Sequence, residues 1–395
     1  MIEDLTSDIL SEYYEKKFPL DRFVSYIGPD DFKTREFMFI VNENVVRNIS
    51  FNTPEKMKEF MVSNSVESAY VGAVYDRPPS KNNRVQDIIW KYREFIFDID
   101  LSDYDAHDSE GNYVGVRTCG CEKYSYCDFC WNLALEAALF INETMKEDFG
   151  FKEMKWFFSG RRGVHGWVMD NETKSLTNEQ RTSILNYLTM INDPTRSQSL
   201  EEIPNEAKPL RNRIFSLLVK PYIEYVFLQD LENPVLQCQN CKSKFRAYDL
   251  IKEVTGRKAE GLRFDTLDKR IKESNIKCKY CSSELTNITK QEVENFGLTE
   301  LKASRIIKQV KETRVFDHNQ YNIIMPDDWK VRRNVANDII LRRYPRIDKA
   351  VSTDIKRVSR LPYSVHGGTG KIAMEIKDIR NFYPDSAPTI WDALM

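Results

Sequence analysis

The sequence lacks any apolar run long enough to cross a membrane, which takes about 18 residues or more. Residues 1–19 are acidic and amphipathic, without the basic stretch and apolar stretch that mark a secretory signal. A strong charge excess is also absent, because 58 lysines and arginines face 60 aspartates and glutamates. We therefore expect an intracellular protein with no membrane partner, in which contact with nucleic acid depends on local basic patches.

Histidine is scarce, and cysteine is confined to two regions. The sequence has four histidines and eight cysteines, and it shows no internal repeat or low-complexity tract. The cysteines are Cys119, Cys121, Cys127, Cys130 and Cys238, Cys241, Cys278, Cys281. In a reducing compartment such clustering favours metal binding over disulfides.

The order of the predicted elements is α+β, then a mostly helical insertion, then α+β again, over 395 residues. The expected parts are 1–200, 201–314 and 315–395. Helices are predicted over 7–17, 54–63 and about 131–147, with capping boxes at Thr177 and Thr289. Strands are predicted over 35–41, 70–75, 94–100, 156–158 and 164–169, the last two forming a hairpin.

Two carboxylates end one of these strands. Asp98 and Asp100 are two residues apart, so their side chains point to the same face. Such a pair suits hard divalent ions, and two ions can assist an in-line phosphoryl displacement. The alternative is a solvated strand end, because Asp103, Asp105 and Asp108 continue the acidic character.

A glycine-flanked basic turn follows in the predicted hairpin. Ser159, Arg161, Arg162 and His165 bring a hydroxyl, two guanidinium groups and an imidazole to one place. Arginine forks match phosphate oxygens, and glycine lets the backbone approach a ligand. The turn is therefore a candidate triphosphate site, the alternative being an exposed basic hairpin tip.

The segment 348–370 repeats this combination of groups. Asp348 is a candidate third carboxylate, and Arg360 and His366 are candidate phosphate contacts beside a glycine-rich stretch. By contrast, His107 and His318 are interpreted as packed or surface histidines.

Both cysteine clusters predict zinc. The first supplies four thiolates within residues 119–130, enough for a closed structural site, with His107 as a substitute ligand. The second consists of two C-x₂-C pairs, which are a strong zinc signal. The basic stretch between these pairs is either a nucleic-acid contact or a solvated face.

Taken together, these motifs resemble the catalytic small subunit of the archaeal and eukaryotic replicative DNA primase. The resemblance is carried by Tyr13-Tyr14 to Pro19, 35–37, 95–105, 119–130, 147–151, 159–167 and 345–370. It implies the archaeo-eukaryotic primase fold, an α+β mixed-sheet core, here with a mostly helical zinc-bearing insertion. It also implies synthesis of short RNA primers from nucleoside triphosphates on single-stranded DNA, with a primase large subunit as partner.

The resemblance further implies roles for single residues. Asp98, Asp100 and Asp348 resemble a catalytic triad that binds two Mg²⁺ or Mn²⁺ ions. The nucleotide-binding residues implied are Arg35, Ser159, Arg161, Arg162, His165, Arg360 and His366. Two departures are Tyr70, where animal-type members carry an acid near the ribose, and the second cysteine cluster, which is not general in the family.

Two other functions remain open. One is a repair-type primase-polymerase that extends primers and prefers deoxynucleotides, and the other is a zinc-bearing nucleic-acid scaffold without catalysis. The late segment resembles archaeal members, while 97–105 resembles eukaryotic ones. We favour an archaeal-type, cytoplasmic enzyme, with the nucleus expected for a eukaryotic one.

Overall fold

The computed structural model describes residues 5–105, 117, 121, 125–189, 213, 217, 228–295, 299–301, 303 and 343–395. The chain divides into two compact units. We call the first the carboxylate unit (Met1–Asp100, Ile141–Thr189 and Arg346–Met395) and the second the cysteine unit (Leu101–Phe140 and Met190–Pro345). Among the described residues, no helix combines the length and apolar character needed to cross a membrane. The division of the chain into parts at 1–200, 201–314 and 315–395 stays a prediction.

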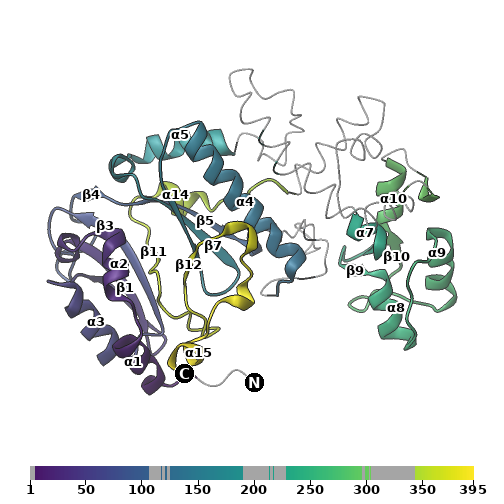
Figure 1. The fold of residues 1–395 in the computed structure, drawn as a ribbon, viewed down its shortest axis with the longest axis horizontal. Coiled ribbons are helices and arrows are strands. Elements are labelled where there is room, and N and C mark those ends of the chain that lie inside the picture. Colours follow the sequence, from purple (N-terminus) through teal and green to yellow (C-terminus); the bar gives the residue numbers. More distant parts are fainter. Residues whose placement is uncertain are drawn as a thin grey trace. The chain divides into compact units, whose positions relative to one another are not determined.

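One sheet of the carboxylate unit has the strand order β11-β3-β1-β2, with β4 paired to β3. Its strands are β1 (Arg35–Val41), β2 (Asn44–Ile49), β3 (Ser68–Tyr75), β4 (Trp90–Tyr92) and β11 (Ser359–Arg360). The helices near it in sequence are α1 (Ser7–Lys16), α2 (Leu20–Ile27), η1 (Asp30–Lys33) and α3 (Pro54–Ser63), drawn in purple in Figure 1. Phe37 and Phe39 of β1 are fully buried in the aromatic core beneath these helices.

The other sheet of this unit has the order β12-β6-β7-β5, of which β5, β7 and β12 are labelled in Figure 1. Its strands are β5 (Phe95–Asp100), β6 (Met154–Phe158), β7 (Gly163–Val168) and β12 (Glu375–Ile376). The remaining elements of this unit are η3 (Asn171–Ser175), α5 (Asn178–Leu188), α14 (Lys349–Thr353), η8 (Ile379–Asn381), η9 (Pro384–Ser386) and α15 (Ile390–Leu394). Two more, η2 (Leu101–Tyr104) and α4 (Asp128–Glu147), begin in the cysteine unit. All strand pairings given for the described residues are antiparallel, so the α+β class is confirmed while the mixed sheet is not observed.

Most predicted elements are confirmed to within a few residues. Thr53 begins α3 by accepting a hydrogen bond from the amide of Lys56, and Thr177 forms the predicted capping box of α5. The capping box predicted at Thr289 is wrong. The helix α10 (Ile288–Asn295) already includes that residue, whose hydroxyl instead accepts the amide of Val235 at 2.8 Å. Asn287 accepts the Lys290 amide and so acts as the cap.

The described part of the insertion is not purely helical. Its sheet has the order β10-β8-β9, formed by β8 (Val235–Cys238), β9 (Lys244–Arg246) and β10 (Leu285–Asn287). The helices are α7 (Leu228–Glu232), α8 (Ala247–Thr255), α9 (Phe264–Glu273) and α10. A separate core that includes Leu236, Ile251 and Leu267 holds the three strands, α8 and α9 together.

This part of the chain also contains a structural repeat, contrary to our expectation from the sequence. The amide of Cys238 donates to the carbonyl of Ser243, and the amide of Cys278 donates to that of Ser283. Each turn has a positive φ before its serine, and each continues into a strand and a helix. The copies share mainly cysteines and serines, which made the repeat hard to see in the sequence.

Candidate active site and metal sites

The predicted carboxylates lie at the end of β5, on one side of its sheet. Phe97 and Ile99 are fully buried on the opposite side, whereas the side chains of Asp98 and Asp100 are 25% and 36% exposed. Asp98 faces His165 across the β5–β7 pairing, and Asp98 Oδ1 lies 3.4 Å from His165 Nε2. The alternation of the strand therefore brings both acids to the same edge.

The third predicted carboxylate is held to the first through the main chain. The amide of Asp348 donates to the carbonyl of Asp98 at 3.0 Å. Its carboxylate caps α14 by accepting the amides of Ala350 (2.8 Å) and Val351 (3.3 Å). Burial, followed by the negative charges of Asp100 and Asp348, raises the pKa of Asp98 to about 7. This concentration of carboxylate charge fits a divalent cation.

The turn between β6 and β7 packs directly against the acids. The amide of Ser159 donates to the carbonyl of Gly163 at 2.9 Å, and the amide of Gly163 donates to Ser159 Oγ at 3.1 Å. A Cβ at Gly163 would lie 2.6 Å from the carbonyl oxygen of Ile99, so only glycine fits against β5. Arg162 Nε donates to Asp100 Oδ1 at 2.5 Å. Arg162, a predicted phosphate ligand, therefore neutralises Asp100, a predicted metal ligand, in this structure.

The glycine-rich late segment lies on the same turn. Thr369 Oγ1 donates to the carbonyl of Gly160 at 2.6 Å. Gly160 has a φ of +90°, and a Cβ there would lie 2.6 Å from the Cβ of His366. The amide of Gly368 donates to His366 Nδ1 at 3.1 Å, so Nε2 is left as the proton-bearing nitrogen. These contacts bring His366 to the basic turn.

Arg360 belongs to β11 of the first sheet, and its charge acts on both histidines of the site. It pairs with Tyr70 in the β11–β3 register, donates to the Tyr70 hydroxyl at 3.0 Å, and its guanidinium carbon lies 4.7 Å from that ring's centroid. Among the described residues its buried Nη1 has no hydrogen-bond partner. Burial and the charge of Arg360 lower the pKa of His165 to about 4 and that of His366 to about 3, which favours neutral imidazoles.

Arg35 is the predicted nucleotide-binding residue that no observed contact brings to this site. It is fully buried in β1, where its guanidinium donates to both oxygens of Glu94 (2.8 and 2.9 Å), to Asp31 (3.0 Å) and to the carbonyl of Gly72. These bonds give it a structural task, and a nucleotide contact stays a prediction.

Arg93, which no sequence motif singled out, nevertheless supports the site. Arg93 is 1% exposed, and its Nη1 donates to the carbonyls of Val351 (3.0 Å) and Asp354 (3.1 Å) at the end of α14. It directly precedes Glu94 and β5, so it joins the strand of Asp98 to the helix that Asp348 begins. Only its position two residues before a buried strand could have drawn attention to it.

The second cysteine cluster is assembled in the cysteine unit. The four Sγ atoms of Cys238, Cys241, Cys278 and Cys281 lie within 4.8 Å of one another. Cys238 and Cys281 are 3.4 Å apart at sulfur, and Cys241 and Cys278 are 3.5 Å apart. Hydrogen bonds from Ser283 lower the pKa of Cys281 to about 5, which favours a thiolate. Four thiolates at these positions suit a closed tetrahedral zinc site.

Three cysteines of the first cluster also come together. The Sγ atoms of Cys121, Cys127 and Cys130 lie within 4.8 Å of one another, while Cys119 and the substitute ligand His107 lie outside the described residues, as does His318. Arg117 donates to the carbonyl of Ser125 at 2.7 Å and pairs with Asp105, which braces the segment. The described thiolates therefore fit a zinc site that needs one more ligand.

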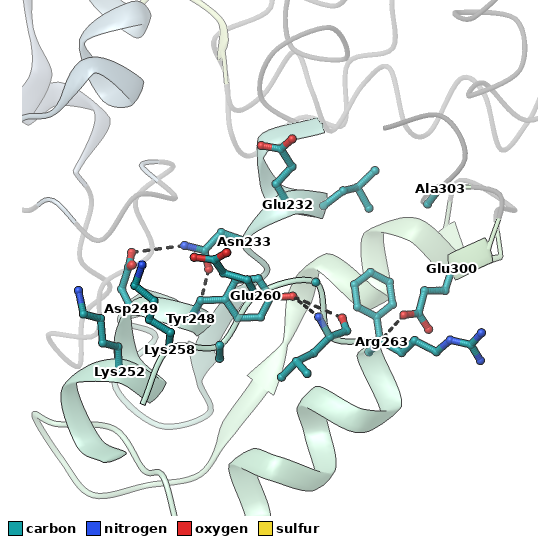
Figure 2. Close-up of a pocket in the computed structure, with 15 residues that line it drawn as sticks. Glu232, Asn233, Tyr248, Asp249, Lys252, Lys258, Glu260, Arg263, Glu300 and Ala303 are labelled. Atoms are coloured by element: carbon teal, nitrogen blue, oxygen red, sulfur yellow. Dashed lines mark hydrogen bonds between the residues drawn. The ribbon is translucent and has the colours of Figure 1, made fainter. Parts of the chain in front are cut away.

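A pocket of about 950 Å³ opens elsewhere in the cysteine unit (Figure 2). The Tyr248 hydroxyl accepts the amide of Leu262 at 2.9 Å, and Glu300 accepts that of Phe264 at 2.7 Å. Acids and bases alternate around it, with Lys258 and Glu260 both labelled in Figure 2. This mixture favours neither an anion nor a cation.

Comparison with known proteins identifies relatives over nearly the whole chain. The sequence model of the DNA primase small subunit family matches residues 97–378. The DNA primase small subunit of Saccharomyces cerevisiae is 25% identical over 395 residues, covering 98% of this chain and 85% of that protein. The DNA primase small subunit of Caenorhabditis elegans is 28% identical over 396 residues, covering 96% of this chain and 84% of that protein. The DNA primase small subunit PriS of Picrophilus torridus is 24% identical over 363 residues, covering 91% and 78%.

Proposed function

Because the chain belongs to the DNA primase small subunit family, we propose that it is the catalytic subunit of a DNA primase. The proposed reaction joins ribonucleotides into a short RNA primer on single-stranded DNA and releases pyrophosphate. In each step a 3′-hydroxyl attacks the α-phosphate of the next nucleoside triphosphate. The observation that carries the proposal is the meeting of Asp98, Asp100 and Asp348 beside the basic turn.

The three carboxylates would hold divalent cations. Their oxygens suit Mg²⁺ and Mn²⁺ equally. Burial, with the negative charges of Asp100 and Asp348, raises the pKa of Asp98, and a bound cation would offset both effects. When bound, two such ions supply activation of the attacking hydroxyl and neutralisation of charge on the reacting phosphates. The main-chain bond from Asp348 to Asp98 keeps the acids in register before any ion arrives.

The side chains around the acids would bind and orient the triphosphate. Arg161 and Arg162 offer guanidinium forks on a turn whose shape depends on two glycines. Arg360 offers the buried Nη1 that has no partner among the described residues, and Tyr70 fixes its orientation. His366 offers Nε2–H, while His165 holds Asp98. Ser159 Oγ accepts the Gly163 amide and keeps its proton for a phosphate oxygen.

Template pairing would select the incoming base, so the protein itself need not read sequence. We expect a primase large subunit as partner, because the family is that of the small subunit. Structural zinc in both cysteine clusters is part of the proposal. It predicts about two zinc ions per purified chain by metal analysis, given one ion for each closed tetrahedral set.

The proposal is tested by primer synthesis from labelled ribonucleotides on single-stranded DNA with Mg²⁺ or Mn²⁺. Asp98→Asn, Asp100→Asn and Asp348→Asn should each lower incorporation by roughly a thousandfold or more, since the cations supply several kcal/mol of transition-state stabilisation. Asp103→Asn is the matched control, because it removes an acid just beyond this cluster and should keep activity.

Folding can be separated from catalysis in these variants. Asp98→Asn should not reduce the unfolding free energy of the metal-free chain, because burial and the charges of Asp100 and Asp348 disfavour the Asp98 carboxylate there. Incorporation that survives in the Asp98→Asn/Asp100→Asn double variant would overturn the catalytic assignment. Preference for deoxynucleotides without primer initiation would instead support the repair-type primase-polymerase.

A further inference from the structure

We call the turns that contain Cys238 to Cys241 and Cys278 to Cys281 the two knuckles of the cysteine unit. They present an aromatic surface that nucleotide addition does not use. Tyr280 stands between Cys278 and Cys281, and it is 62% exposed. Its ring centroid lies 5.8 Å from that of Phe245, at an interplanar angle of 31°. Phe245 belongs to β9, directly after the first knuckle, so each copy of the repeat contributes one ring. We call this pair the aromatic shelf.

Cations surround the aromatic shelf. Lys279 Nζ lies 5.8 Å from the Phe245 centroid and 5.7 Å from the Tyr280 centroid. Lys244 lines the same small hollow. The two knuckle segments 238–246 and 277–283 contain lysine and arginine at five positions and no aspartate or glutamate: Lys242, Lys244, Arg246, Lys277 and Lys279.

Acids also border the hollow, and Arg246 is paired with the buried Asp230, whereas the ion pair that Lys279 makes is exposed. Asp249 and Glu253 lie at its edge on α8. Lys279 Nζ is 3.7 Å from Glu253 Oε2, with the two side chains 45% and 62% exposed. Such an exposed pair is weak and is screened by salt, so Lys279 can exchange this carboxylate for another anion.

Packing alone does not account for the shelf. Phe245 is 7% exposed and belongs to the core that includes Cys238 and Cys278, so it shields the thiolates. Tyr280 leaves most of its surface in solvent, at the tip of the second knuckle. An exposed ring on a turn between two clustered cysteines, flanked by lysines, has the features of a base-stacking platform.

We propose that the aromatic shelf binds single-stranded nucleic acid, with a base stacked on Tyr280 and backbone phosphates beside Lys279 and Lys244. Stacking tolerates any base, which suits a protein that must follow an arbitrary template. This binding goes beyond the proposed nucleotide addition, and it does not require the carboxylates to be catalytic.

The test uses the full-length, zinc-loaded chain and fluorescence anisotropy with labelled oligothymidylate or oligouridylate, without nucleotides. Oligomers of roughly 10 to 30 nucleotides are suitable, since domains that bind single strands cover about 4–16 nucleotides. Tyr280→Ala should weaken binding by roughly 5- to 100-fold, while Tyr280→Phe keeps the ring and the affinity. Val254→Ala, which truncates another exposed side chain of the same unit (53% exposed), should change nothing.

The lysines are tested through salt dependence. Lys279→Gln should reduce the slope of log affinity against log salt by about 0.7, the value for one phosphate contact of a single strand. Lys269→Gln, which removes an exposed charge on α9 of the same unit, should leave the slope unchanged. Comparing the DNA and RNA oligomers then distinguishes a template strand from a primer strand as the ligand.

Zinc content and circular dichroism of each variant control for folding. If Tyr280→Ala loses zinc, the Lys279→Gln salt slope decides the question on a chain whose rings are intact. Wild-type affinity in zinc-loaded Tyr280→Ala, or an unchanged slope in Lys279→Gln, would overturn the proposal. Failure of primer synthesis with normal Tyr280-dependent binding would overturn the proposed function and leave this inference standing.

Discussion

Arg93 gives the most direct test of how the carboxylate site is held together. Arg93→Met removes two hydrogen bonds from a charged donor, one to the buried carbonyl of Val351 and one to the partly buried carbonyl of Asp354. Each such bond contributes roughly 1.5–3 kcal/mol. Part of this loss is offset, because the substitution also removes Nε and Nη2 of Arg93, which are buried without hydrogen-bond partners among the described residues. We expect a net loss of about 2–4 kcal/mol in unfolding free energy.

Arg93 is a positioning residue, so its loss should also change metal binding. Without it, α14 is free to shift, and Asp348 shifts with it. Mn²⁺ affinity measured by electron paramagnetic resonance should fall along with kcat, and Arg93→Lys should restore part of both. Arg181→Met is the control, since Arg181 is equally buried and its hydrogen bonds to the described residues go to carbonyls outside α14, including those of Arg93 (2.7 Å) and Glu94 (3.1 Å). Equal Mn²⁺ affinity in both methionine variants would refute the positioning role.

Two further substitutions probe the basic turn. Arg162→Gln frees Asp100 from its ion pair, so the affinity for Mn²⁺ in titrations should rise about two- to fivefold. The KM for the nucleoside triphosphate should rise roughly tenfold or more, because one phosphate contact is lost. A fall in the Mn²⁺ affinity together with the nucleotide affinity would contradict this. Gly163→Ala places a Cβ against the carbonyl of Ile99, so β5 and β7 must separate at the acids. Denaturant unfolding should show that the unfolding free energy falls by about 1–3 kcal/mol, and primer synthesis should fall by a larger proportion. A variant with unchanged stability and activity would show that the turn adapts to the added methyl group.

Local sequence patterns predicted the strands and the hairpin because the causes are local. The alternation over 95–100 fixes which side chains share a face, and the threonines at 53 and 177 cap their helices through residues three positions away. Thr289 failed as a cap because its hydroxyl accepts the amide of Val235, a partner from a distant strand. A capping pattern is decisive only where no tertiary partner competes for the hydroxyl.

Buried arginines could not be found in the same way. Arg93 and Arg181 look like ordinary charged residues in sequence, and only contacts with carbonyls of other elements make their burial tolerable. Arg35 has a nucleotide contact implied by the resemblance, which stays a prediction, and in the structure it is paired with Glu94 and Asp31. Charge in sequence therefore does not tell a ligand-binding arginine from a structural one.

Asp348 illustrates why the third acid was the hardest part of the site to derive from the residues alone. An aspartate before a short helix is common, and this one does cap α14 by accepting the amides of Ala350 and Val351. Its place beside Asp98 depends on a main-chain hydrogen bond between two segments that the whole cysteine unit separates in sequence. Because that bond uses an amide and a carbonyl, it leaves no side-chain signature. The cap and the proposed metal ligand are thus the same carboxylate, and only the fold joins the two roles.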